Sequence, residues 1–499
     1  MAFATGDDTE LKAYPVVQTL DVEMKTMTTE SPQEGEVMPL IDKAIAKTET
    51  PADGAICYRM QPVRELLRKG GCNGDCHIEA LLSSSDLPPC VLGQQQHTVI
   101  HVDDVCRVAL MITPQPNGSP IDQAWEAIST MRVILQQQAA EMTVTMQTVF
   151  VASKDDIPAL QKLFAAYFGD RVPATSFIIQ PPCEGQALAI EAWAIGCTDN
   201  KDENSATKLD IQYPASNVVT VAYDSLRWIY FAGVTPSADA ENAYDESASV
   251  FDQLADRLAR VDARLSDVPR VWLYQGGITT EETAADGSRI ERYRELNRAR
   301  TDFFDLQQAA GHMAISDSGS TIYPASTGIG MQSSGLTLSA MALQTSRDDV
   351  KMLSLENPQQ TSAFDYAKTF SVKSPKFARA MAVRVGRYVT TWVSGTASIL
   401  NSESVHLGDI EKQTEQTIDN IEQLISRNNF KRHGMEGCGA ELNDLAKIRV
   451  YVKRNEDYKK CKEVCERRFG SLPTIYAIAD VCRPELLVEI EGVAFSNVE

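Results

Sequence analysis

A threefold internal repeat is the feature of this sequence that most constrains its fold. The same succession of signals (strand, helix, strand, helix, then a proline-containing turn before the last strands) occurs three times in 499 residues. Helices on one side of such a sheet leave an apolar face that must be buried elsewhere. The sequence therefore predicts an α+β fold in which three units bury those faces against one another, as a pseudo-trimer within a single chain. The turns lie about 150 residues apart, at Pro173-Ala174-Thr175, Pro324-Ala325-Ser326 and Pro473-Thr474-Ile475.

Local periodicity divides the chain into five segments. Helices are predicted where apolar residues recur at intervals of three and four, and strands where β-branched residues cluster between turn signals. An inserted loop at residues 276–291 is expected to overhang a cleft. The predicted segments are a polar arm with a cysteine-containing stretch at 1–95, a first unit at 96–205, a second at 210–345, a linker at 346–376 and a third unit at 377–499.

The overall charge argues against a nucleic-acid partner. The chain has a formal net charge of −21 and a pI near 4.8, and it contains no clustered basic run. No apolar stretch is long enough to span a membrane, so no membrane partner is expected, and the first residues do not resemble a secretory leader. An odd number of cysteines, 11 at irregular spacing, is typical of reduced thiols, so a cytoplasmic location is expected.

No cofactor and no metal site are predicted. Cys72, Cys76 and His77 could form half of a metal site with Cys57 or Cys90, but no second cysteine pair of suitable spacing follows. Loop or core thiols are therefore the favoured interpretation. The sequence also lacks a phosphate-binding loop, a dinucleotide-binding glycine pattern and the HExxH motif.

A strand with two carboxylates near the C-terminus is the main candidate for chemistry. In Leu487-Val488-Glu489-Ile490-Glu491, strand alternation places Glu489 and Glu491 on one face. Burial of Glu489 in a cleft would raise its pKa, so that it could act as a general acid near neutral pH. Arg483, six residues upstream, could hold a carboxylate. The alternative is a solvated strand edge with two ordinary acids.

Two further sets of residues have open interpretations. Cys482 lies beside Arg483, which would favour a thiolate, but a cysteine in a pocket wall or in the core is the favoured interpretation. The turn SGTAS follows a predicted strand of the third unit. Its residues Ser394 and Thr396 either bind a substrate carboxylate or only satisfy the turn.

The ends of the repeats carry a family resemblance. PATSF followed by ALAIEAWAIG in the first unit, and LPTIY followed by LLVEIEGVAF in the third, resemble the Rid (YjgF) superfamily of homotrimeric, chorismate mutase-like proteins. The resemblance implies that an arginine after Pro-Ala holds the substrate carboxylate in imine-deaminating members, and that the first glutamate of the closing strand positions water. Here that glutamate is kept only as Glu489, with Ala189 and Thr337 in the other units. The arginine positions hold Thr175, Ser326 and Thr474 or Ile475.

Residues 320–499 are similar to one branch of this superfamily, the chorismatases. The similar segments are TGIG, ENPQQTSAFDY, SPKFARA, SGTASI and ADVCRPELLVEIEG. The resemblance implies that Glu489 acts on the substrate, that the Cys482–Arg483 pair lines the pocket and that Tyr366 contacts the substrate. Lys368 stands close to where the family would have an arginine.

The sequence thus predicts a chorismatase-like enzyme that cleaves the enol-pyruvyl ether of chorismate, or of a related small cyclic carboxylate, with Glu489 as general acid and with Arg483, Cys482, Tyr366, Lys368, Ser394 and Thr396 as substrate-binding residues. The expected partner is a small carboxylate, and the expected assembly is a monomeric pseudo-trimer or a higher homo-oligomer. The alternatives are a non-catalytic Rid-like binding or assembly protein and, more weakly, an imine or enamine deaminase.

Overall fold

The computed structural model describes residues 96–197, 207–283, 287–316, 319–365 and 373–499. The polar arm at 1–95, with its cysteine and histidine pattern, lies outside the described residues, and so do Tyr366 and Lys368. The mixed α+β class predicted from the sequence is confirmed. None of the described helices is both long enough and apolar enough to cross a membrane.

The first unit is a five-stranded sheet with the order β1-β2-β5-β3-β4. Its closing strand β5 pairs antiparallel with both β2 and β3, whereas β4 pairs parallel to β3. A helix connects the two parallel strands because such a connection must return across the sheet. The elements are β1 (His97–Val102), β2 (Val105–Ile112), α4 (Pro120–Gln136), β3 (Thr143–Val151), α5 (Ile157–Phe168), β4 (Ala174–Ile179) and β5 (Leu188–Cys197).

The second unit repeats this pairing in a six-stranded sheet, β14-β9-β15-β8-β7-β6. Its main elements are β6 (Asp210–Ala215), β7 (Val218–Tyr223), β8 (Leu226–Val234), α6 (Ala243–Arg260), β9 (Arg270–Gly276), α7 (Arg292–Ala309), β14 (Ala325–Met331) and β15 (Leu336–Thr345). The predicted inserted loop contains a short hairpin between β9 and α7, formed by β10 (Glu281–Thr283) and β11 (Arg289–Glu291), and two more strands, β12 (Ala314–Ile315) and β13 (Thr321–Ile322), form another hairpin after α7.

The third unit has the sheet order β16-β17-β18-β23-β21-β22. Part of the stretch predicted as a linker forms its edge strand, β16 (Val350–Leu355), which pairs antiparallel with β17. The other elements are β17 (Ala380–Val385), β18 (Tyr388–Ala397), β19 (Ile399–Leu400), β20 (Glu403–Ser404), α8 (Ile410–Ile425), α9 (Arg427–Arg432), β21 (Leu445–Val452), α10 (Tyr458–Phe469), β22 (Thr474–Ile478) and β23 (Val488–Asn497).

Local sequence signals set where several helices begin. Ser119 accepts a hydrogen bond from the backbone N–H of Asp122, whose carboxylate accepts one from the backbone N–H of Ser119, and Pro120 follows the cap. Such a reciprocal box satisfies backbone donors that the first turn leaves unpaired. Asn242 and Asp409 cap α6 and α8 in the simpler way, with a single side-chain acceptor.

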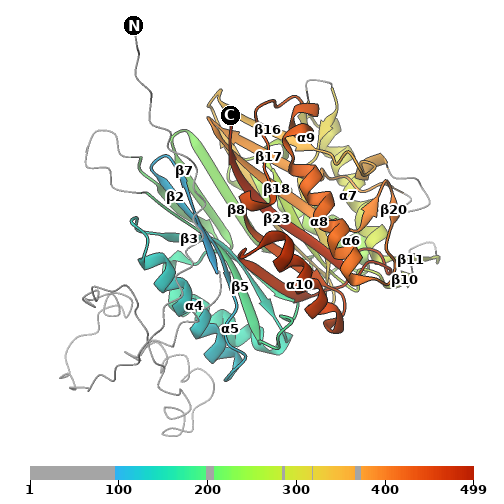
Figure 1. Ribbon diagram of the computed structural model, residues 1–499, viewed down its shortest axis with the longest axis horizontal. Coiled ribbons are helices and arrows are strands. Elements are labelled where there is room, and N and C mark those ends of the chain that lie inside the picture. The colour runs from blue at the N-terminus through green and yellow to red at the C-terminus, as the bar shows by residue number, and fades with distance from the viewer. Residues whose placement is uncertain (1–95, 198–206, 284–286, 317–318, 366–372) are drawn as a thin grey trace, which may run out of the picture.

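The sheets face one another and the helices cover their outer faces (Figure 1). Each unit has its own apolar layer beneath its helices. A further apolar cluster contains residues of all three sheets. In it the indole ring of Trp392 contacts those of Trp193 and Trp272, with ring centroids 5.6 and 6.1 Å apart. Aromatic rings of this size contribute much of the burial energy where they meet, so this contact joins the three units.

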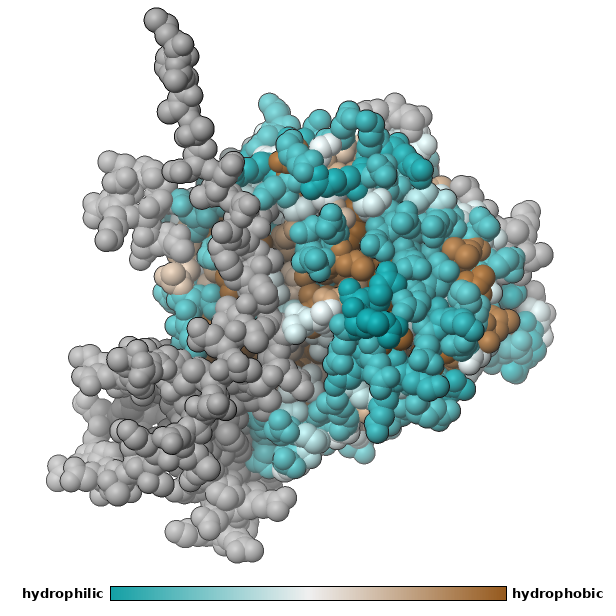
Figure 2. All heavy atoms as spheres, in the orientation of Figure 1, coloured by the Kyte–Doolittle hydropathy of each residue, from teal (hydrophilic) through white to brown (hydrophobic). Residues whose placement is uncertain are grey.

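The outer surface has the opposite character. In the view of Figure 2 the described residues are mostly hydrophilic, with only small hydrophobic groups among them. Large apolar side chains that are well exposed, among the described residues, are limited to Leu306, Ile315 and Leu407. The apolar surface of the units is therefore buried between them and under their helices.

Candidate active site

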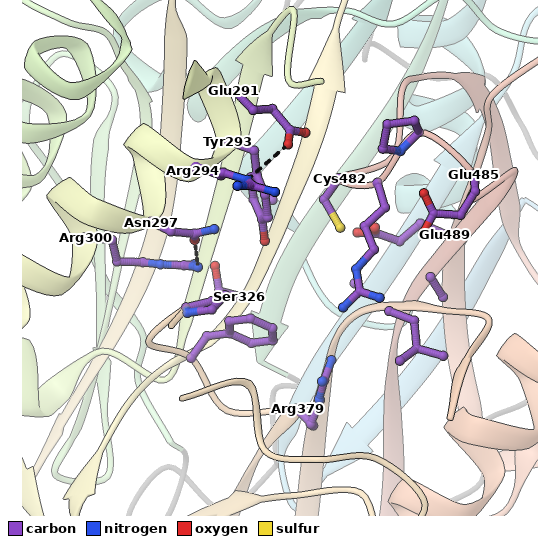
Figure 3. A pocket seen from close by; sticks show the side chains of 18 residues that line it. Glu291, Tyr293, Arg294, Asn297, Arg300, Ser326, Arg379, Cys482, Glu485 and Glu489 are labelled. Atoms are coloured by element: carbon purple, nitrogen blue, oxygen red, sulfur yellow. Dashed lines mark hydrogen bonds and ion pairs between the residues drawn. The ribbon is translucent and has the colours of Figure 1, made fainter. Parts of the chain in front are cut away.

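A cavity of about 210 Å³ lies between the second and third units. Its walls come from the start of α7, from β14, from the segment before β17, from the end of β18 and from the loop that precedes β23. Figure 3 shows charged side chains from both units pointing into this space. Neither unit forms the cavity alone. Glu291, the last residue of the inserted loop, lies in its wall, as expected for a loop that overhangs a cleft.

Glu489 lies on β23 and lines the cavity, with 4% of its surface exposed. Burial raises the pKa of its carboxyl group to about 8, and the negative charge of Glu491 contributes to the rise, against the opposing effect of Arg270 and Arg379. Within the part of the chain that the structure describes, its carboxyl group forms no hydrogen bond or ion pair. A carboxyl group in this setting is mostly protonated at neutral pH and can donate a proton.

The backbone of Gly395 packs directly against this carboxyl group. The pairing of β18 with β23 shifts between Val393 and Thr396, which places Gly395 in an irregularity of the ladder. A Cβ atom at this position would lie 2.9 Å from Glu489 Cδ and closer still to Oε1. A side chain at position 395 would therefore displace the Glu489 carboxyl group from this place.

One face of α7 forms the opposite wall. Tyr293, Asn297 and Arg300 follow one another at intervals of four and three, so they share that face. The guanidinium of Arg300 donates a hydrogen bond to the Asn297 side-chain oxygen. Burial is the main cause that raises the pKa of Tyr293, and Cys482 and Glu489 raise it further. Tyr293 is therefore a neutral hydroxyl group in the same cavity as Glu489.

Two buried arginines from different units lie beside the same phenylalanine ring in the cavity. The guanidinium carbons of Arg300 and Arg379 lie 5.3 and 5.4 Å from the centroid of the Phe377 ring. Their exposed fractions are 2% and 5%. Buried guanidinium groups are suited to binding carboxylates through two parallel hydrogen bonds. The cavity therefore combines a proton donor with two buried guanidinium groups, which suit an acidic ligand, and the less buried Arg294, Arg483, Glu291 and Glu485 complete its charged lining.

Sequence reasoning missed both of these arginines. Arg379 belongs to the segment SPKFARA, and Arg300 lies in the middle of α7. The family resemblance instead placed a cation shortly after Tyr366, close to Lys368. The polar residues of α7 that recur at intervals of four and three could have indicated Arg300. A search for apolar periodicity does not detect such polar residues.

Cys482 and Arg483 both line the cavity. Burial raises the pKa of the Cys482 thiol to about 12, and Glu489 contributes to the rise. The thiol is therefore neutral, which favours the pocket-wall interpretation over a reactive thiolate. The Arg483 guanidinium donates hydrogen bonds to the Ser402 carbonyl oxygen at 2.8 Å and to Ser404 Oγ at 3.1 Å.

Ser394 and Thr396 are buried next to the cavity but do not line it. Ser394 Oγ donates to the Ala378 carbonyl oxygen and accepts from the backbone N–H of Ser326, and Thr396 Oγ1 donates to the Ser394 carbonyl oxygen. Their hydroxyl groups thus hold the strand end in place, and direct substrate binding by them stays a prediction. Ser326 does line the cavity, and its own hydroxyl has no partner among the described residues.

A second cavity, of about 420 Å³, lies between the first and third units around Thr474. None of the described residues that line it is an arginine, and its single lysine, Lys462, pairs with Glu184 at 2.9 Å. It therefore lacks the buried arginines that line the first cavity. Among the described residues, no cluster of histidine, cysteine and acidic side chains could hold a metal ion.

Comparison with known proteins identifies relatives along much of the chain. It is 36% identical over 235 residues to a 3-hydroxybenzoate synthase of Streptomyces hygroscopicus, a match that covers 46% of this chain but only 63% of the synthase. It is 32% identical over 264 residues to a chorismatase of the same species, covering 53% of this chain and 71% of the chorismatase. A RutC family protein of Pyrococcus abyssi is 30% identical over 133 residues, which are 26% of this chain and 95% of that protein. No protein-family model matches.

A solved structure shows the same fold. The crystal structure of a chorismatase superposes with a TM-score of 0.54 at 22% identity, and the match covers 79% of this chain and all of the other. Sheets with helices on one face, and a cavity between two of them that contains a buried acid and buried arginines, define a Rid/YjgF-like protein with an inter-unit site. The chain belongs to the chorismatase family within that superfamily, which confirms the resemblance seen in the sequence.

Proposed function

We propose that the protein is a chorismatase-type enzyme that cleaves the enol-pyruvyl ether of chorismate or of a closely related small cyclic dicarboxylate. The observation that carries the proposal is the enclosed Glu489 carboxyl group, whose pKa of about 8 keeps it protonated at neutral pH opposite Arg300 and Arg379. A proton donor beside two cations matches a substrate that carries carboxylates and an acid-labile double bond.

In the proposed reaction, the arginines bind the carboxylates of the substrate. Glu489 transfers its proton to the methylene carbon of the enol ether, which leaves an oxocarbenium ion and the Glu489 carboxylate. Water adds to the cation and returns a proton to Glu489, and the resulting hemiketal collapses to pyruvate and a ring alcohol. Tyr293 and the Ser326 hydroxyl lie where they can hydrogen-bond the substrate or the water.

The experiment is incubation of the full chain with chorismate, with pyruvate release followed by a coupled lactate dehydrogenase assay. Glu489→Gln should lower kcat by about 10²- to 10⁴-fold because it removes the transferable proton. The matched control is Glu463→Gln on the outer face of α10, which should retain wild-type turnover. Turnover should also decline above about pH 8 as Glu489 ionises.

Folded wild-type protein that releases no pyruvate, or a Glu489→Gln variant with full turnover, would contradict the proposal. Protein that binds chorismate without cleaving it would instead support the alternative of a Rid-like binding protein. A ligand-induced shift of the protein's melting temperature distinguishes that case from a complete lack of binding.

We also propose that the three units form a single-chain pseudo-trimer. The equivalent pairing of β5, β15 and β23 with their neighbours, and the tryptophan contact that joins the units, support this arrangement. Sedimentation should then give the mass of one chain, 54.9 kDa, or of a higher assembly of closed chains. An obligate trimer held through the sheet faces would contradict it.

A further inference from the structure

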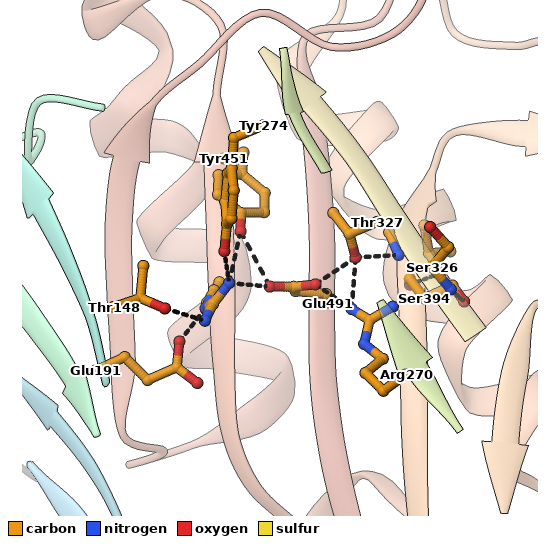
Figure 4. Close-up of polar contacts among 12 residues, drawn as sticks. Thr148, Glu191, Arg270, Tyr274, Ser326, Thr327, Ser394, Tyr451 and Glu491 are labelled. Atoms are coloured by element: carbon orange, nitrogen blue, oxygen red, sulfur yellow. Dashed lines mark hydrogen bonds and ion pairs between the residues drawn. The ribbon is translucent and has the colours of Figure 1, made fainter. Parts of the chain in front are cut away.

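A group of buried charges lies where the three units meet, outside the cavity (Figure 4). Glu491 on β23 accepts hydrogen bonds from Arg270 of the second unit and from the Tyr451 hydroxyl, the latter at 3.0 Å, and it pairs with Arg449 at 2.8 Å. Arg449 also pairs with Glu191 of the first unit. These four charged side chains are each at most 4% exposed. All three units therefore contribute to the environment of Glu491.

This environment keeps Glu491 ionised. Burial alone would raise its pKa, but Arg449 and Arg270, together with hydrogen bonds from Thr327 and Tyr451, outweigh burial and hold the pKa of Glu491 below its usual value. Glu489 lies two residues away on the same face of the same strand, at a spacing of about 7 Å. A fixed negative charge at that distance disfavours a second one.

Thr327 connects this group to the cavity. Its hydroxyl donates a hydrogen bond to Glu491 and accepts one from Arg270, and it also accepts one from the backbone N–H of Gly395 at 2.9 Å. Gly395 is the residue that packs against the Glu489 carboxyl group. The fully buried Thr327 hydroxyl thus connects Glu491 and Arg270 to the backbone of Gly395, which lies against Glu489.

We propose that Glu491 and Thr327 are positioning residues for Glu489: Glu491 holds the neighbouring carboxyl group in its protonated form, and Thr327 holds Gly395 against it. This rests on the proposed role of Glu489 as the acid. It implies that the proton donor of one unit depends on cations and a hydroxyl from another. The titratable and charged groups around Glu489 are Glu491 on β23, Tyr451 on β21, Arg270 on β9, Tyr293, Arg294 and Arg300 on α7, Glu291 just before α7, Arg379 before β17, and Cys482, Arg483 and Glu485 before β23.

The neighbours of Glu489 determine the direction in which its pKa changes in each variant. Glu491→Gln removes the repulsion and leaves Arg270 and Arg449 with less counter-charge, and both changes favour the ionised form of Glu489. Its pKa should therefore fall by more than one unit. Thr327→Val removes the hydroxyl at nearly constant volume and releases the Gly395 N–H, which becomes available as a donor to the Glu489 carboxylate. The pKa of Glu489 should fall here too, by less.

The experiment titrates Glu489 directly in full-length protein labelled with [13Cδ]glutamate, with its NMR resonance assigned by its loss in Glu489→Gln. Wild type should titrate near pH 8, Glu491→Gln and Thr327→Val at lower pH, and Thr327→Ser, which keeps the hydroxyl, near wild type. Thr391→Val is the matched control, because Thr391 is fully buried on β18 and its hydroxyl has no partner among the described residues. Its titration should not change.

The alkaline limb of kcat/KM supplies the second measurement. Under the proposal it shifts to lower pH in Glu491→Gln and Thr327→Val together with the NMR titration, whereas a merely structural role would lower activity equally at every pH. Unchanged Glu489 titration in both variants overturns the proposal. If Glu491→Gln does not fold, Thr327→Val decides alone. A shifted titration in protein that releases no pyruvate would support the positioning role while contradicting the proposed function.

Discussion

Replacing Glu489 by glutamine should change how the stability of the protein depends on pH. The folded-state pKa of about 8 lies about 3.5 units above the ordinary value of 4.5. Between these two pH values the native state holds a proton that the unfolded state has lost, so the contribution of Glu489 to stability is complete below about pH 4.5 and is lost as pH rises to about 8. At 1.36 kcal/mol per unit, the whole loss is about 5 kcal/mol, of which a small part occurs below pH 5.

Glutamine has nearly the shape of the protonated side chain but cannot ionise. The free energy of unfolding of Glu489→Gln, minus that of the wild type, should therefore increase by about 4 kcal/mol between pH 5 and pH 9. Urea unfolding at a series of pH values, followed by tryptophan fluorescence, measures this difference. All other titrating groups cancel because both proteins share them.

Glu463→Gln is again the matched control, since an exposed glutamate should give a constant difference across the same range. A constant difference for Glu489→Gln as well would refute the reasoning, because it would mean that Glu489 ionises alike in the folded and unfolded chains. If the difference in unfolding free energy rises with pH but has its midpoint near pH 5, Glu489 is already ionised in the folded protein at neutral pH. That result would refute the enclosed, protonated state.

Three further substitutions test the packing of the cavity and of the tryptophan contact between the three units. Gly395→Ala places a methyl group against Glu489 Oε1, so kcat/KM for pyruvate release should fall by about 100-fold while the circular dichroism spectrum is retained. Arg379→Lys keeps the charge but loses the planar pair of donors, so the KM for chorismate should rise by about tenfold or more, in steady-state assays. Trp392→Ala removes the ring that joins the three units and should lower the free energy of unfolding by about 3–5 kcal/mol, measured in urea.

The sequence predicted the repeating order of elements well because that order depends on local patterns. The alternation at 487–491, for example, placed Glu489 and Glu491 on one face of a strand, and both lie within β23. Cys482 and Arg483 were likewise found from a local segment. The strand β16 was missed, because an edge strand with half-buried residues lacks a clear period.

What the sequence determined by itself is therefore the α+β class, the local order of strands and helices and the pair of acids on one strand face, because sterics between neighbouring residues fix helix and strand periodicity. Only the tertiary structure decided which cations surround those acids. Arg270 and Glu491 are 221 positions apart, and Arg300 and Arg379 come from different units. Contacts of that kind arise from how whole sheets pack, and the same packing removes Glu489 from water and thereby sets its proton affinity.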